Sequence, residues 1–257
     1  MSQLQLTKDK IPKLIRQLAI PTSIGFFFNT MYNVVDTYYA GLLSTSAQGA
    51  LSIAFPVFFI VIAMGSGLAS GVTALIATAL GEGNHREAER YAKQSLSFSL
   101  ILGIILTIVG FLITPTLFKF LGASGEYLEV ATQYMYVQFS VAIIFVLVFI
   151  INGILNALGD TKTYRNALTA GFFINLLLSP ALMFGWGIFP ELGLIGIAWA
   201  TASIQILKLI YLALVLSKTE LAFTKHTKEY RPQNKYYKAI AFQGFPAGFS
   251  MMTVAFG

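Results

Sequence analysis

The sequence predicts an all-α membrane protein, a six-helix transmembrane bundle followed by the start of a seventh helix. The first observation is composition, because hydrophobic residues make up 56% of the chain and charged residues only 11%. A soluble domain carries about 25% charged residues, so this chain could not cover a surface that faces water. The second observation is that long uncharged stretches recur along the chain, separated by short charged or polar segments.

The first two spans are predicted over residues 17–42 and 51–80. From Thr37 to Gly81 the chain has 45 uncharged residues in succession, more than twice the roughly 20 that one bilayer crossing needs. A turn must therefore divide this stretch. The small and polar residues of Leu43–Gly49 are the best suited to form it.

Four more spans are predicted over residues 94–115, 128–157, 166–187 and 194–216. Their lengths and the absence of period-2 alternation argue against a β-barrel. Residues 217–238 are the most polar part of the chain and are predicted to form a cytoplasmic linker. We therefore expect residues 1–216 to form one six-helix lobe and residues 239–257 to be the truncated start of a second lobe.

A weak internal repeat supports this division. The segment YYKAIAFQGFPAG after the linker resembles PKLIRQLAIPTSIG at the entry to the first span. At an offset of 225, Lys13 matches Lys238 and Pro21 matches Pro246. Internal repeats are common in transporters. The sequence therefore resembles one half of a two-lobed carrier plus the beginning of the other half, and we expect Gly257 to lie inside a helix.

The distribution of Lys and Arg predicts the orientation. With the N-terminus in the cytoplasm and six alternating spans, 15 of the 17 basic residues fall in inner segments. We therefore expect an integral protein of the cytoplasmic (inner) membrane, with the lipid bilayer as its partner. The basic residues form no single face and no reader motif occurs, which excludes nucleic acid as a partner.

Residue types that enzymes and metal sites need are scarce. The chain has no Cys and two His residues, so a transition-metal site lacks ligands. It contains no H-E-x-x-H, Walker A or nucleophile-elbow sequence. The sequence therefore predicts neither an enzyme nor a cofactor.

One acidic residue, Asp36, lies inside a predicted span and away from its first and last turns. A carboxylate there costs roughly 2.5–3.5 kcal/mol on insertion scales, and such residues usually mark a functional pathway. Asn29, Tyr32 and Asn33 precede it at helical spacing, so the four side chains share one face. This polar stripe must face a cavity or another helix. A functional role for Asp36 is favoured over simple solvation at the outer end of the span.

Two further polar pairs occur one helical turn apart in the fifth and sixth spans. They are Asn175 with Ser179, and Thr201 with Gln205. Each pair could line a substrate or ion pathway, or could form hydrogen bonds between helices, and the spacing does not decide between these roles.

Prolines and a lysine also interrupt the apolar spans. Pro21 and Pro180 are candidate hinges or kinks, because proline removes a backbone donor from a helix. Lys208 lies eight residues from the inner end of the sixth span, so its side chain is expected to reach the membrane interface. An ion pair with Asp36 is the alternative for Lys208, disfavoured because the predicted topology places the two residues toward opposite faces.

Several segments together resemble the multidrug and toxic compound extrusion (MATE) family of transporters. They are AIPTSIGFFFNTMYNVVDTYYAGLL, ALGEGNHREAERYA, NALGDTKTYRNAL and LGLIGIAWATASIQ. The resemblance implies that this chain is the first lobe of a twelve-helix, inverted-V transporter whose second, C-terminal lobe is a partner. It also implies export of small cationic or amphipathic compounds, including drugs, driven by inward flow of H+ or Na+.

The same resemblance implies roles for individual residues. Asp36 matches the acidic residue of the family's first helix, the usual coupling residue, while Asn175 and Thr201 match the polar network around it. Ser179 departs from the pattern, because several members have Asp there. A hard cation relies on anionic oxygen ligands, so Asp36, Asn175 and Thr201 would form only a weak Na+ site, and a proton is favoured as the coupling ion.

Two other functional classes remain open from the sequence. A lipid-linked saccharide or lipid flippase of the same superfamily would share the lobe, but should line its cavity with basic residues that bind pyrophosphate. The spans offer only Lys208 for that purpose. An accessory or receptor-like membrane protein would not need Asp36.

Overall fold

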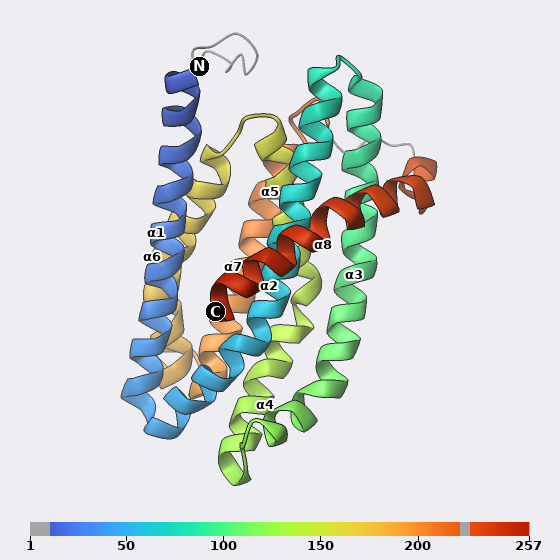
Figure 1. Ribbon diagram of the computed structural model, residues 1–257. Coiled ribbons are helices and arrows are strands. Elements are labelled where there is room, and N and C mark those ends of the chain that lie inside the picture. Colours follow the sequence, from blue (N-terminus) through green and yellow to red (C-terminus); the bar gives the residue numbers. More distant parts are fainter. Residues whose placement is uncertain (1–10, 222–226, 257) are drawn as a thin grey trace.

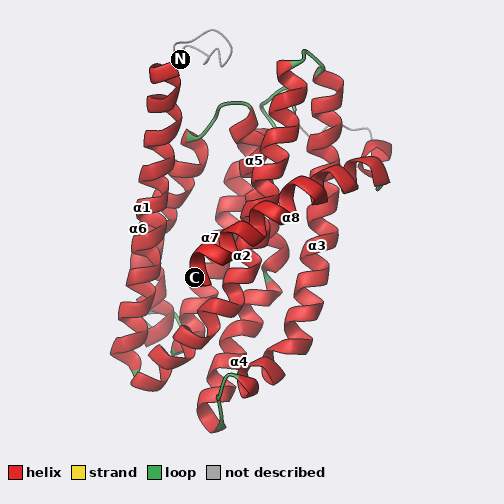
Figure 2. Ribbon diagram, in the orientation of Figure 1, coloured by secondary structure: helices red, strands yellow, loops and turns green. Residues whose placement is uncertain are grey.

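The computed structural model describes residues 11–221 and 227–256, and all regular structure in these residues is helical (Figures 1 and 2). The elements are α1 (Ile11–Leu43), α2 (Thr45–Gly81), α3 (His85–Phe120), α4 (Gly125–Ser140), α5 (Ala142–Ala157), α6 (Lys162–Phe184), α7 (Leu194–Leu216), the 3-10 helix η1 (Thr227–Tyr230) and α8 (Asn234–Phe256). The predicted all-α fold class is therefore confirmed.

The apolar helices account for the predicted spans. Among the described residues, α2, α3, α6 and α7 are long and apolar enough to cross a membrane, and α4 with α5 makes a fifth span if the bent pair is counted as one. The remaining predicted span is α1, which has 33 residues. It is not among the strongly apolar helices, because it carries the polar stripe of Asn29, Tyr32, Asn33 and Asp36.

The turn between the first two spans is much shorter than predicted. Only Ser44 separates α1 from α2, whereas the sequence suggested Leu43–Gly49. The Ser44 backbone is extended, and its hydroxyl accepts a hydrogen bond of 3.0 Å from the Ala47 N–H. A serine N-cap satisfies a free backbone donor of the first turn, so the second helix begins at once.

The fourth predicted span is not one straight helix. α4 and α5 meet at Val141 and differ in direction by 47°. The Thr107 hydroxyl of α3 donates a 3.0 Å hydrogen bond to the Phe139 carbonyl, which in an unbroken helix would accept from the N–H of residue 143. A side chain that inserts into the backbone hydrogen bonds of a helix in this way is a known cause of helix kinks.

The helices pack in pairs that bring distant segments together. α1 lies beside α6, and α8 crosses α2 diagonally (Figure 1). The crossing depends on the GSGLASG segment of α2: a Cβ atom added to Gly67 would lie 2.2 Å from the backbone nitrogen of Gly248. The sequence motif G-x-x-x-G, here Gly67 and Gly71, therefore allows two backbones to approach closely.

The segment before α8 is held to α3 by polar contacts. Gln94 is fully buried, and its amide nitrogen donates to the Glu229 and Arg231 carbonyls at 2.6 and 2.9 Å. Its amide oxygen accepts from the Gln233 N–H at 3.0 Å. Neighbouring Lys93 forms ion pairs with Glu89 and Glu229. Burial alone would lower the pKa of Lys93, but these carboxylates outweigh it and raise the pKa above its ordinary value.

α8 begins at Asn234, five residues before the apolar stretch that the sequence places from residue 239. The N–H groups of Tyr236 and Tyr237 both bond to the Gln233 carbonyl, which begins the helix before the apolar stretch. Three parts of these predictions lie outside the described residues: 1–10 of the predicted lobe, 222–226 of the predicted linker and Gly257 of the predicted second lobe. The division into lobe, linker and second lobe stays a prediction.

Candidate functional site

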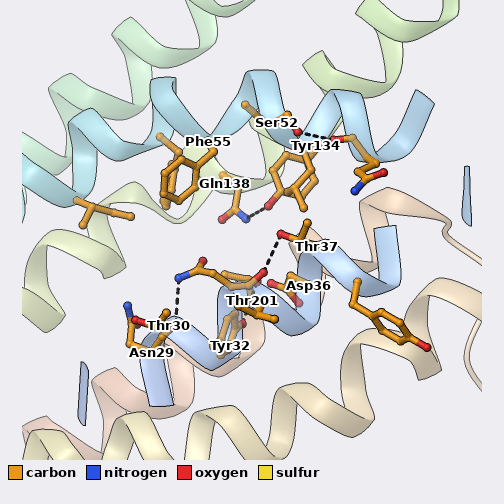
Figure 3. Close-up of a pocket in the computed structure, with 18 of the residues that line it drawn as sticks. Asn29, Thr30, Tyr32, Asp36, Thr37, Ser52, Phe55, Tyr134, Gln138 and Thr201 are labelled. Carbon is orange, nitrogen blue, oxygen red and sulfur yellow. Dashed lines mark hydrogen bonds between the residues drawn. The ribbon is translucent and has the colours of Figure 1, made fainter. Parts of the chain in front are cut away.

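A cavity of about 920 Å³ opens between α1, α2, α4 and α7 (Figure 3). All four residues of the polar stripe on α1 line it, and both polar residues singled out on α7 line it as well. These six predicted residues are Asn29, Tyr32, Asn33, Asp36, Thr201 and Gln205. α2 contributes an apolar wall that includes Phe55 and Phe58. The stripe therefore faces a cavity.

Asp36 is 6% exposed and is held by two donors from α6. The Asn175 amide nitrogen donates to Asp36 Oδ1 at 2.8 Å, and the Ser179 hydroxyl donates to the same oxygen at 3.2 Å. The Asn175 amide also donates to Ser179 Oγ at 2.8 Å. Asn175 and Ser179 are fully buried and lie behind the carboxylate, outside the cavity wall. The second oxygen, Oδ2, accepts no hydrogen bond from the described residues.

Tyr32 joins α1 to α7 beside this carboxylate. Its hydroxyl donates a 2.9 Å hydrogen bond to Thr201 Oγ1. The Thr201 hydroxyl therefore contacts Tyr32, one helical turn from Asp36. The three candidate ligands of a weak Na+ site thus come from α1, α6 and α7. Asn175 bonds directly to the Asp36 carboxylate, whereas Thr201 bonds to Tyr32.

Three buried amide oxygens near the site accept no hydrogen bond from the described residues. They are Asn175 Oδ1, Gln138 Oε1 and Gln205 Oε1. An unsatisfied buried acceptor costs about 1–3 kcal/mol. Gln138 and Gln205 belong to the cavity wall. Together with Asp36 they make a region rich in acceptors, which suits a proton donor or a cation.

Two cavity residues on α4, Tyr134 and Gln138, escaped the sequence analysis. The Gln138 amide donates to the Tyr134 hydroxyl at 3.1 Å, and both side chains are buried (Figure 3). Their spacing of four residues is the same signal that identified Asn175 with Ser179. In the sequence this signal is masked by the many apolar residues of the predicted span 128–157.

Lys208 does not reach the membrane interface, so that prediction is wrong. The side chain is 7% exposed and lines the cavity, with Nζ 5.5 Å from the centre of the Tyr32 ring. Gly171 of α6 makes room for it, since a Cβ atom there would lie 2.8 Å from Lys208 Cε. Lys208 faces α1 and α6 because of the rotation of α7, which a single sequence does not specify. It forms no ion pair with Asp36 either.

The candidate hinge prolines both lie inside helices, Pro21 in α1 and Pro180 in α6. Pro180 has no N–H to donate to the carbonyl four residues earlier. That carbonyl belongs to Leu176, and the Tyr39 hydroxyl of α1 donates to it at 3.1 Å. The proline thus creates an acceptor that joins α6 to α1 close to Asp36, while its role as a hinge stays a prediction.

Clusters of three or more His, Cys, Asp or Glu that could hold a metal ion do not occur in residues 11–221 and 227–256.

Comparison with known proteins gives matches along the whole chain. A family model described as MatE matches residues 21–181, more than half of the chain. A protein of Shewanella oneidensis named FAD transporter is 31% identical over 196 residues, 76% of this chain and 43% of that protein. The probable multidrug resistance protein YoeA of Bacillus subtilis is 30% identical over 216 residues, which are 83% of this chain and 47% of that protein.

Solved structures agree with the sequence matches. A transporter of the MOP superfamily from Pyrococcus furiosus is 30% identical, with a TM-score of 0.90 over 100% of this chain and 56% of that one. A structure described as an outward-facing multidrug resistance MATE family transporter has the same TM-score, identity and coverage. The chain thus spans about half the length of the curated relatives and solved structures that it matches.

Proposed function

The chain belongs to the MatE family of membrane transporters, and from that premise we propose that the full-length protein is a multidrug efflux antiporter. In this proposal it exports small cationic or amphipathic compounds by alternating access, with Asp36 as the coupling residue and a proton as the favoured coupling ion. Family members are transporters and not enzymes, so the site is a binding and coupling site and its chemistry is proton and ligand exchange.

The observation that carries the proposal is the asymmetric environment of Asp36. Two α6 side chains donate to Oδ1, whereas Oδ2 accepts nothing from the described residues and the carboxylate lines the cavity. An intramembrane carboxylate is costly, and such residues usually mark a substrate or ion pathway. One oxygen is thus oriented by the protein, and the other is available to a proton or to a cationic group in the cavity.

Exchange of a proton for a cationic compound at this carboxylate couples export to the proton gradient. Ionised Asp36 attracts a cationic compound, because attraction between opposite charges is strong away from bulk water. Protonated Asp36 is neutral and loses that attraction. A proton that arrives from outside would therefore discharge the compound there, and loss of the proton to the cytoplasm would restore the site.

Ser179 supports a proton over Na+. Its hydroxyl proton points to Asp36 Oδ1, and its oxygen already accepts from Asn175. The site accordingly offers one carboxylate, whereas a hard cation favours several anionic or carbonyl oxygens. On α6, the unsatisfied Asn175 Oδ1 is a further oxygen acceptor beside the Asp36 carboxylate.

Alternating access needs a second lobe against which this one moves. The solved relatives are longer, with this chain covering 56% of the first one. We therefore propose that the C-terminal lobe is the principal partner. We further propose that the protein lies in the cytoplasmic (inner) membrane with its N-terminus in the cytoplasm, as the distribution of Lys and Arg favours.

Two observations favour a wider substrate range as a second candidate. One relative is named a FAD transporter, and the cavity wall contains a base, Lys208. A lipid-linked saccharide or lipid flippase is weaker, because pyrophosphate recognition usually needs several basic groups and the described wall has this one.

The test is transport by the full-length protein in sealed vesicles, with ethidium as the cationic probe. We expect an imposed proton gradient to drive ethidium movement and a sodium gradient alone to have no effect. Vesicles without protein are the control. Movement driven only by sodium would overturn proton coupling, and no gradient-dependent movement with either ion would overturn the antiporter.

A further inference from the structure

Lys208 is a buried ammonium that forms no ion pair with an anion among the described residues. The side chain is 7% exposed, and no described residue accepts a hydrogen bond from Nζ or lies within ion-pair distance of it. Nζ lies over the face of the Tyr32 ring, 5.5 Å from the ring centre. A cation–π contact replaces only part of the hydration that a buried ammonium loses. The group thus retains the capacity to bind an anion.

The cavity gives this ammonium a ligand-accessible position. Asp36 and Lys208 are the two charged side chains among the described residues of its wall. They do not pair, and Tyr32 contacts Lys208 with its ring and Thr201 with its hydroxyl. The cavity therefore presents a carboxylate and an ammonium at separate places, with aromatic wall residues such as Phe55 and Phe58.

The packing of α6 holds the ammonium at this place. Gly171 faces Lys208, and a Cβ atom added there would lie 2.8 Å from Cε and 3.4 Å from Nζ. Any larger residue would push the charged end of the side chain away. Because Gly171 is not part of the cavity wall, it offers a way to move the ammonium without changing the wall itself.

We propose that Lys208 forms an anion-binding subsite of the cavity, and that the substrates include amphipathic compounds with a carboxylate or phosphate group on an aromatic body. This rests on the proposed transport function and names a substrate class for the same cavity. A zwitterionic compound would place its cationic part toward Asp36 and its anionic part on Lys208, against the ring of Tyr32.

The subsite also changes the consequence of protonating Asp36. With Asp36 ionised, the two wall charges cancel, and with Asp36 neutral the wall keeps the positive charge of Lys208. On protonation a cationic or zwitterionic compound loses its attraction to Asp36 and can be released, whereas a purely anionic compound is held more firmly and falls outside the exported class. The effect of Asp36→Asn on binding should accordingly have opposite signs for cationic and anionic ligands.

The test compares two dyes that differ in one charge. Rhodamine B has a free carboxylate, and its ethyl ester is a cation with the same ring system. Binding of both dyes to the full-length protein is measured by fluorescence anisotropy in detergent that carries no charge. We expect Lys208→Gln to lower the preference for rhodamine B over the ester by about tenfold or more, as loss of a charge-assisted hydrogen bond implies. Lys208→Arg should preserve that preference.

Gly171→Ala keeps every charge and should lower the same preference by displacing the ammonium, which provides a second result if Lys208→Gln does not fold. A preference unchanged in both Gly171→Ala and Lys208→Gln would overturn the subsite. Export of the ester under a proton gradient tests the proposed function separately, since it does not require an anion. If phosphatidylglycerol competes with rhodamine B while phosphatidylcholine does not, the anion is a lipid phosphate and the assignment to exported compounds is wrong.

Discussion

At the residue scale, the two oxygens of Asp36 have different environments. Oδ1 is oriented by Asn175 and Ser179, while Oδ2 has no donor among the described residues. A proton or a cationic group can therefore bind at Oδ2 without displacing a hydrogen bond within the protein. Donors on the far side keep the carboxylate aimed at the cavity in both protonation states.

Asp36→Asn should abolish gradient-driven export by the full-length protein while leaving its insertion and folding intact. The amide imitates the neutral acid but cannot exchange a proton, so export is no longer coupled to the movement of protons. The measurement is ethidium efflux from vesicles under a proton gradient, with circular dichroism to verify folding. Glu126→Gln is the matched control, since it removes an exposed carboxylate that does not line the cavity. Export at the wild-type rate by Asp36→Asn would show that coupling occurs elsewhere.

At the element scale, α1 and α6 are joined by polar contacts that a proline makes possible. Pro180 leaves the Leu176 carbonyl without an intrahelical donor, and Tyr39 on α1 supplies one at 3.1 Å. The contact lies beside Asn175 and Ser179, the residues that bond to Asp36. The position of α6 against Asp36 thus depends on an acceptor that a regular helix would not offer.

Tyr39→Phe should destabilise the protein by about 1 kcal/mol, because it leaves the Leu176 carbonyl without a donor. Thermal unfolding in detergent measures the loss. In a Pro180→Ala background the Leu176 carbonyl regains an intrahelical donor, so the same substitution should cost less. Equal losses in both backgrounds would mean that the tyrosine hydroxyl does not act through this carbonyl. Tyr38→Phe, at an exposed neighbour, is the control.

The crossing of α2 and α8 is a second feature at this scale. Gly67→Ala places a Cβ atom 2.2 Å from the Gly248 backbone, so the helices must separate. We expect a loss of about 1–3 kcal/mol, typical of overpacking, and a lower unfolding temperature. Gly81→Ala is the matched control in the same helix, because a Cβ atom there meets nothing within 4 Å. If both variants unfold at the same temperature, the close approach of the two backbones is not required for stability.

At the scale of the whole molecule, the turns alternate between two ends of the bundle. The α1–α2, α3–α4 and α6–α7 connections lie together at one end, and the α2–α3 and α5–α6 connections lie at the other (Figure 1). This alternation agrees with a chain that crosses the membrane repeatedly. The ends also differ in charge: Arg86, Lys162 and Arg165 lie at the second end, where the positive-inside rule favours the cytoplasm.

Cysteine labelling can test this orientation, because the chain has no native Cys. Single cysteines at Ser46 and Ser124 should react with an impermeant thiol reagent added outside intact cells, since both positions are exposed at the first end. A cysteine at Glu82, exposed at the other end, should react only after the membrane is permeabilised. The reverse pattern would invert the proposed topology.

Much of the fold and the centre of the site could be predicted from residue type and spacing. Charge-poor stretches indicated the helices, because an apolar segment long enough to cross the bilayer must satisfy its own backbone hydrogen bonds there, as a helix does. Asp36 was evident, because an acid in such a segment is rare and costly. Its neighbours Asn29, Tyr32 and Asn33 followed from helical spacing, which places them on one face.

Contacts between helices were decided only by the tertiary structure. Asn175 lies 139 residues from Asp36 along the chain, and one sequence does not specify the rotation that brings them together. The break at Val141, the wall residues Tyr134 and Gln138, and the position of Lys208 depend in the same way on neighbouring helices. Residue type and helical period by themselves determined which face of each helix is polar. Packing determined which polar faces meet, because that depends on side chains from several helices at once.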